Sequence, residues 1–349
     1  MRIAFPYNNW RGGFLNSIQK ACERLGHKTL SCKRYNAPLL NKFLRRVDIK
    51  SVKVPAIHYK EVEYNRNLFQ QLSSFRPEVF INLSGSGLFP ETVKKIRSDL
   101  NCTTVCFIAD NPCDPAPIRD KYFAMSLEFY DVLLLPEPIW EKMIKNLTPN
   151  SKVIPFYGGY EPEKFFPVSQ QEIDEKDMEE FTCDVSFTGG SYNESPEGAY
   201  RAAILGKLNE YNIKIWGDEG WQYRFQFYSS LQKAYQGPRL SYNELRKLYT
   251  ISKINLNLPS PQILTGFQPR VFEIAACKGF QIIDHSDELY SIFDEDEIVT
   301  FKGTNDLKAK ISYYLVHSDE RKMIAEKAYQ RVVNQYTWEN QVAKIINEF

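Results

Sequence analysis

The sequence has almost no net charge, few histidines, no paired-cysteine motif and no long apolar run, and each lack excludes something. Lys and Arg number 44 against 43 Asp and Glu, so the formal charge of +1 gives no overall attraction for nucleic acid. Apolar runs fall short of the roughly 20 residues that a membrane span needs. The start, MRIAFPYNNW, turns polar too soon for a secretory signal. We expect a soluble, cytoplasmic protein without nucleic-acid partners; the basic stretch at 41–53 leaves peripheral membrane contact open.

The seven cysteines and four histidines are scattered and show no spacing typical of a zinc site or of a disulfide framework. We therefore expect free thiols in a reducing compartment and no bound metal. A GxGxxG fingerprint is also lacking after the first apolar run. Nothing in the sequence therefore favours a two-domain oxidoreductase that binds a dinucleotide.

Short apolar runs alternate with amphipathic, helix-like stretches along most of the chain. The runs at 78–84, 103–110 and 131–136 are nearly continuous, which is typical of parallel strands covered on both faces. An acidic, turn-rich stretch interrupts this pattern, which then restarts at 184–190. We predict two doubly wound, Rossmann-like α/β domains, with ligands bound in a cleft at the carboxyl ends of their strands.

The interruption defines the predicted domain boundaries, and a chain of 349 residues is long enough for two separate cores. We place the first domain at 1–165, a linker at 166–183 and the second domain at 184–335. A final helix at 336–349 is expected to pack back on the first domain.

Two loops of the first domain follow predicted strands and carry polar side chains. The loop NNWRGG follows the first strand and supplies candidate contacts for an acceptor substrate. These candidates are Trp10, Arg11, Gly12 and Gly13. The loop FIADNP places Asp110 and Asn111 where Pro112 ends a strand, and a carboxylate there can accept a proton from an acceptor hydroxyl or bind a sugar hydroxyl. The alternatives are a flexible turn for the first loop and a turn-capping aspartate for the second.

Two features of the second domain favour phosphate binding. Gly189 and Gly190 end a predicted strand ahead of a helix, where exposed backbone N–H groups can hold an anion. In GFQPRVFEIAACKGFQIID (266–284), Pro269 begins an apolar helix whose first turn carries Arg270 and Glu273. A guanidinium can bind phosphate oxygens in bidentate fashion, and a carboxylate can accept from a vicinal diol. The alternatives are an ordinary βα turn and a surface ion pair at i and i+3.

Motifs of the second half also occur in a characteristic order. These are SFTGG (186–190), YQGPRLSYNELRKLYTISKINLNL (235–258), the R-x-F-E helix at 270–273 and YTWENQVAKII near residue 346. In this order they resemble the GT-B glycosyltransferases of the group 1 superfamily, in the branch of the spore-maturation protein CgeB. The resemblance covers 180–349 well and the first half loosely, chiefly through FIADNP. It implies the GT-B fold, with two Rossmann-like domains facing a central cleft, the donor held by the second and the acceptor by the first.

The resemblance also implies roles for individual residues. Glu273 would bind the ribose hydroxyls of a nucleotide, and Arg270 would face its diphosphate. The loop of Thr265, Gly266, Phe267 and Gln268 would lie against the transferred sugar. The segment that contains Gly237, Arg239 and Leu240 would lie near the base. Thr265 stands where many relatives have a glutamate eight residues before the ribose glutamate, which leaves the donor sugar and the stereochemistry open.

These observations together predict a glycosyltransferase of the hexosyltransferase type, active in polysaccharide or glycoconjugate biosynthesis. Its donor would be a nucleotide-diphosphate sugar of the UDP, GDP or dTDP type, and its acceptor a hydroxyl of a glycan, a lipid-linked sugar or a protein. Asp110 and Arg270 are the predicted catalytic residues, and no cofactor or metal is expected. The alternative is a catalytically inactive GT-B-like protein that binds a nucleotide or a glycan.

Overall fold

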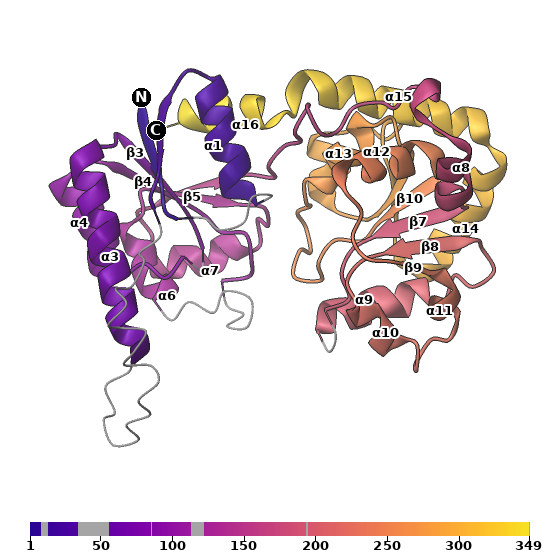
Figure 1. Cartoon of the computed structure of the whole chain (residues 1–349), viewed down its shortest axis with the longest axis horizontal. Coiled ribbons are helices and arrows are strands. Elements are labelled where there is room, and N and C mark those ends of the chain that lie inside the picture. The colour runs from indigo at the N-terminus through magenta and orange to yellow at the C-terminus, as the bar shows by residue number, and fades with distance from the viewer. Residues whose placement is uncertain (8–12, 34–55, 85, 113–121, 193–194, 349) are drawn as a thin grey trace. The chain divides into compact units, whose positions relative to one another are not determined.

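The computed structural model describes residues 1–7, 13–33, 56–84, 86–112, 122–192 and 195–348, with the backbone alone for 56–60. The chain forms two compact units, which are Met1–Phe156 with Val342–Phe349, and Tyr157–Gln341 (Figure 1). In the described part, each unit contains a six-stranded sheet whose paired strands are all parallel. The prediction of two doubly wound α/β domains is therefore confirmed.

The sheet of the first unit has the strand order β2-β1-β3-β4-β5-β6. Its strands are β1 (Arg2–Phe5), β2 (Lys28–Ser31), β3 (Val79–Leu83), β4 (Thr103–Phe107), β5 (Val132–Leu135) and β6 (Lys152–Pro155). Its helices are α1 (Phe14–Arg24), α3 (Ala56–Phe75), α4 (Pro90–Asp99), α6 (Phe123–Ser126), η1 (Leu127–Phe129), α7 (Trp140–Leu147) and the later part of α16 (Trp338–Ile346). The central strands β3, β4 and β5 are nearly continuous runs of buried apolar residues, as expected of parallel strands covered on both faces.

The sheet of the second unit has the order β12-β11-β10-β7-β8-β9. Its strands are β7 (Val185–Thr188), β8 (Ile213–Trp216), β9 (Tyr235–Gly237), β10 (Ile254–Asn257), β11 (Gln281–Asp284) and β12 (Val299–Phe301). The helices before β10 are η2 (Gln170–Glu172), α8 (Glu175–Phe181), α9 (Pro196–Leu205), α10 (Gly220–Arg224), α11 (Ser230–Ala234) and α12 (Tyr242–Ile251). Those after β10 are α13 (Arg270–Ala276), η3 (Asp287–Ser291), α14 (Gly303–Val316) and α15 (Ser318–Gln335). A capping box of Ser241 and Glu244 begins α12.

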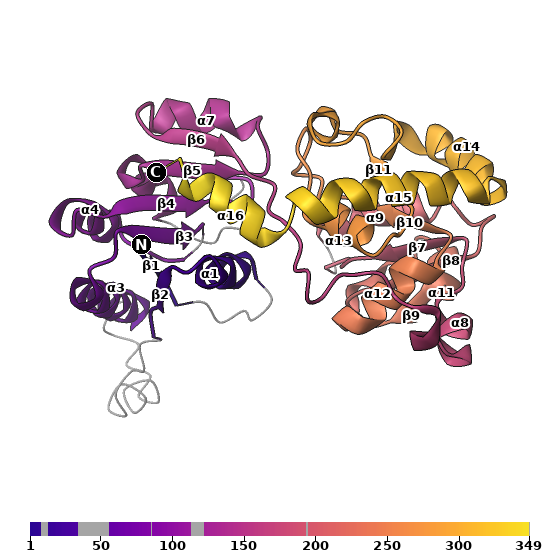
Figure 2. The same ribbon diagram turned by 90° about the horizontal axis from the view of Figure 1, so that it is seen from above.

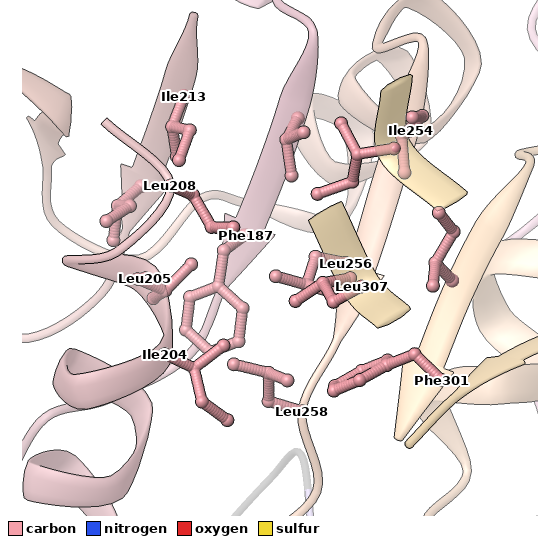
Figure 3. Close-up of a cluster of buried hydrophobic side chains, with 14 of the residues drawn as sticks. Phe187, Ile204, Leu205, Leu208, Ile213, Ile254, Leu256, Leu258, Phe301 and Leu307 are labelled. Atoms are coloured by element: carbon pink, nitrogen blue, oxygen red, sulfur yellow. The ribbon is translucent and has the colours of Figure 1, made fainter. Parts of the chain in front are cut away.

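Two apolar layers cover the two faces of this second sheet. Phe187 and Leu256 point to one face, where they pack with side chains of α9, α11 and α14 (Figure 3). Ile283 belongs to the other layer, with α13 and Tyr249 of α12. Helix α15 packs on α13 and contributes side chains to both layers (Figure 2).

The parallel arrangement brings the carboxyl ends of four neighbouring strands to one edge of the second sheet. Thr188, Trp216, Asn257 and Asp284 end β7, β8, β10 and β11. Loops that are far apart in the sequence therefore start side by side at this edge, which is where ligands bind in open α/β sheets.

Candidate functional site

The loop that follows β7 is held in place by side chains from two other elements. Asp218, just after β8, accepts hydrogen bonds at one carboxylate oxygen from the backbone N–H groups of Ser191 (3.2 Å) and Tyr192 (3.1 Å). The indole Nε1 of Trp221 donates to the carbonyl of Gly189 at 2.8 Å. A side chain at Gly190 would overlap the second oxygen of Asp218, which explains why glycine is needed there. The predicted Gly189–Gly190 turn is thus a fixed structure.

Arg201 of α9 reaches the same loop, and the sequence analysis missed it. Its Nη1 donates to the carbonyl of Gly190 at 2.9 Å, and the residue is only 5% exposed. Its Nε is buried and has no hydrogen-bond partner among the described residues. Burial lowers the pKa of Arg201, and the positive charge of Arg270 lowers it further, so the charges of the two guanidinium groups interact. Arg201 is therefore a buried cation with an unused N–H donor, and it interacts with the charge of Arg270.

Arg270 and Glu273 begin α13, and they lie beside Tyr249. Within the described residues, the two charged side chains form no ion pair with each other or with any third group within 4 Å. Burial raises the pKa of Glu273, while the positive charge of Arg270 opposes this shift. Burial also raises the pKa of Tyr249 to about 12, again against the charge of Arg270. The hydroxyl of Tyr249 lies 3.4 Å from that of Thr188, so this tyrosine of α12 reaches the strand end that carries the glycine loop.

Part of the predicted sugar-side loop serves as an anchor for the fold. The side chain of Phe267 is fully buried and stacks on Tyr157, with ring centroids 4.2 Å apart. The Thr265 carbonyl accepts from the hydroxyl of Ser286 and from the backbone N–H of Glu288 (3.4 Å). Gly266 is buried, and Gln268 is partly exposed. Any ligand contact from Phe267 must therefore use its backbone.

In the segment predicted to lie near the base, some residues support the fold and one side chain is exposed to solvent. Leu240 packs against the buried cluster of Phe181, Trp216 and Leu248. Gly237 has a φ of +138°, and its carbonyl accepts from the N–H of Gly217 at 3.1 Å. Arg239, in contrast, is exposed, with Nη2 3.9 Å from the Asp218 carboxylate. Of these three residues, Arg239 has a side chain that can meet a ligand.

The predicted acceptor residues belong to the first unit. Asp110 and Asn111 follow β4 and are both partly buried. The backbone leading to them is held by Ser84, whose hydroxyl accepts from the N–H of Ala109 at 3.3 Å. Gly13 is buried and precedes α1 with extended backbone angles, φ −84° and ψ 162°. Trp10, Arg11 and Gly12 lie outside the described residues.

No group of three or more His, Cys, Asp or Glu side chains suited to a metal ion occurs among the residues that the structure describes. The six cysteines in this part of the chain are buried and form no disulfide. None of the helices described is both long and apolar enough to cross a membrane.

Comparison with known proteins agrees with this geometry. Residues 201–347 match the family model described as glycosyl transferase-like. The spore protein CgeB of Bacillus subtilis (strain 168) is 34% identical over 80 residues, which are 23% of this chain. The matched region spans about a quarter of that relative's length, 24%.

Solved structures match over nearly the whole chain at low sequence identity. Sucrose-phosphate synthase from Thermosynechococcus elongatus has a TM-score of 0.71 and 13% identity, and the match covers 99% of this chain and 98% of that one. A glycosyltransferase from Rickettsia africae ESF-5 gives 0.65 and 14%, with 99% and 97% covered. HepE from Anabaena, solved in complex with UDP and glucose, gives 0.66 and 11%, with 100% of both chains covered.

These matches show the fold over the whole chain and support sugar transfer as its activity. The resemblance predicted from the motifs is therefore confirmed: the chain has the GT-B fold and is similar to the glycosyl transferase-like family, with a CgeB-like relationship over part of its length.

Proposed function

We propose that the protein transfers a sugar from a nucleotide-diphosphate sugar to an acceptor hydroxyl, with the donor bound at the edge of the second sheet. The observation that carries this proposal is the pair of Arg201 and Arg270. The charges of their guanidinium groups interact, and Arg201 is buried with an Nε that has no partner among the described residues. Among the residues that the structure describes, these two cations have no ion-pair partner. Two such charges are costly in an empty site, and a polyanionic ligand removes that cost.

In this proposal, the two guanidinium groups stabilise the charge that develops on the leaving diphosphate. Guanidinium N–H groups form short, charge-assisted bonds to phosphate, and they act most strongly where water is excluded. Arg201 is already oriented by its bond to the Gly190 carbonyl, so little reorganisation is required of it. We therefore propose that these arginines supply the stabilisation, so that donor binding requires no metal. Donor binding that survives EDTA would support this step, and binding that EDTA abolishes would contradict it.

Glu273 is proposed to hold the ribose of the donor. Its raised pKa reflects burial, and a ligand that donates two hydroxyl hydrogen bonds would compensate the buried carboxylate. The positive charge of Arg270 acts on this carboxylate, which supports a ribose position next to the proposed diphosphate position. The solved complexes of HepE with UDP and with UDP-glucose support a donor of this chemical type.

On the acceptor side, Asp110 is the proposed base or sugar ligand. It follows the central strand β4, where a partly buried carboxylate has a fixed position. If Asp110 removes the proton of the acceptor hydroxyl, the reaction proceeds with inversion at the sugar. If it only binds the acceptor, retention of configuration is equally compatible with the proposal.

A thermal-shift screen against UDP-, GDP-, dTDP- and CMP-sugars tests the donor, because a ligand that binds the folded state raises its melting temperature. Release of the sugar or its transfer to a mixed set of glycans then tests turnover. A melting shift together with sugar release supports the proposal. A shift without transfer or hydrolysis would instead indicate a GT-B-like binding protein, and no shift with any nucleotide would contradict donor binding.

A further inference from the structure

Tyr192 has an unusual backbone conformation that its position in the fold does not explain. It is one of four non-glycine residues in the described part with positive φ, and its value is +50°. The other three (Arg76, Asn101 and Lys278) each follow a helix closely, where a left-handed residue is a common helix ending. Tyr192 lies instead in the loop after β7, where glycine would adopt the same angles at a lower cost.

The surrounding structure enforces this conformation. The backbone N–H of Tyr192 donates to Asp218 at 3.1 Å, and its carbonyl accepts from the N–H of Ser195 at 3.1 Å. The ring lies against Gly190, because a Cβ built there would come within 2.7 Å of the Cζ atom of Tyr192. The strained backbone therefore has a definite result, which is to place a phenol directly over the glycine turn.

The phenol interacts with two arginines. The Nη2 atom of Arg239 donates to it at 3.4 Å, and the guanidinium carbon lies 5.9 Å from the ring centroid. Arg201 also interacts with this phenol, although burial keeps the pKa of Arg201 below its usual value. Because the oxygen accepts from a cation, its own hydrogen remains available, and a hydroxyl polarised in this way is a better donor.

We propose that Tyr192 is a further donor-binding residue, whose hydroxyl donates to a phosphate oxygen of the nucleotide held by Arg201. The inference rests on the proposed function and adds a specific contact to it. The ring is 48% exposed, so a ligand can reach the hydroxyl without any movement of the core. Tyr192 would contribute to the affinity for nucleoside diphosphates and contribute nothing to that for the nucleoside alone.

The test compares Tyr192→Phe with the wild type by calorimetry, using UDP, GDP and dTDP and the matching nucleosides. Loss of one hydrogen bond to a charged group should raise the dissociation constant of the diphosphate by about 10- to 150-fold. The dissociation constant of the nucleoside should not change. Tyr223→Phe is the matched control, because Tyr223 is also exposed (39%) and has a guanidinium 5.2 Å from its ring.

Tyr192→Gly separates binding from a structural role. Glycine relieves the strain of the positive φ, so the melting temperature of the free protein should stay the same or rise while diphosphate affinity falls at least as far as in Tyr192→Phe. Wild-type affinity in Tyr192→Phe would overturn the inference and leave the proposed function intact. Absence of nucleotide binding by the wild type would overturn both, and equal losses of diphosphate and nucleoside affinity would show that Tyr192 only maintains the loop.

Discussion

Replacing Arg201 by methionine should separate stability from ligand binding. Methionine keeps much of the length and volume of the side chain and removes its charge. In the free protein the change deletes the bond from Nη1 to the Gly190 carbonyl, and it also removes a buried cation whose charge interacts with that of Arg270. The first effect destabilises the fold and the second stabilises it.

The two effects on folding are of similar size. A hydrogen bond from a charged donor contributes about 1.5–3 kcal/mol. Replacing a buried charge by an apolar side chain can stabilise a protein by about 1–4 kcal/mol. We therefore expect the free energy of unfolding of Arg201→Met to stay within about 2 kcal/mol of the wild type. Loss of its bonds to phosphate should raise the dissociation constant of a nucleoside diphosphate by about 10- to 150-fold.

Chemical denaturation and calorimetry measure these two quantities on the same preparation. The matched control is Arg224→Met, since Arg224 is also buried and also binds this loop. Arg224 donates to the hydroxyl of Ser191 at 3.0 Å and to the carbonyl of Ser195 at 2.9 Å. With both of those bonds lost, the control should lose at least about 2 kcal/mol of stability. A destabilised Arg201→Met protein that still binds nucleotide like the wild type would refute the reasoning.

The remaining predictions concern the other residues of the site and its core. Glu273→Gln should remove the part of the pH dependence of stability that comes from the raised pKa of Glu273. Above pH 4.5 the unfolded chain releases this proton while the folded wild type keeps it, so the free energy of unfolding falls as the pH rises towards the raised pKa. Denaturation at a series of pH values should show this fall in the wild type relative to the variant. Asp110→Asn should reduce turnover at least about 100-fold with little change in donor affinity, and full turnover would remove Asp110 as the base. Gly190→Ala should displace the carboxylate of Asp218 and weaken diphosphate binding in calorimetry, whereas wild-type affinity would show that the loop can adjust. Phe187→Ala should lower the free energy of unfolding by about 3–5 kcal/mol in denaturant titrations, because this fully buried ring packs between the sheet and α9 (Figure 3). A smaller loss would mean that the core closes around the gap.

The central strands and the glycine turn could be predicted because their signals are local. A nearly continuous apolar run indicates a covered parallel strand, and β3, β4 and β5 all lie in such a run. The edge strands β2 and β6 were not predicted, because half-exposed edge strands such as KTLS and KVIP carry no such run. Turn residues at the end of a predicted strand likewise indicated the turn of Gly189 and Gly190. The side chains that hold this turn, Asp218 and Trp221, are seen only in the structure.

Arg201 and Asp218 were missed because their roles depend on tertiary contacts. Arg201 lies among alanines in AYRAAIL, and only the packing of α9 against the loop after β7 turns its side chain towards Gly190. A single charged residue on the buried face of a predicted helix is a signal that could have located it. For Phe267 and Leu240, the motif predicts a position beside a ligand, and both side chains pack into the protein interior.

The first unit is built from two separate stretches of the chain, and this affects the order in which it can fold. Val342 and Ile345 are buried and belong to that unit, although the whole second unit separates them in sequence from Phe156. During synthesis, the first sheet therefore emerges long before the helix that completes its core. A ribosome-bound chain that stops before residue 342 should bury less apolar surface in its first unit, and resist protease there less, than the same chain extended through α16.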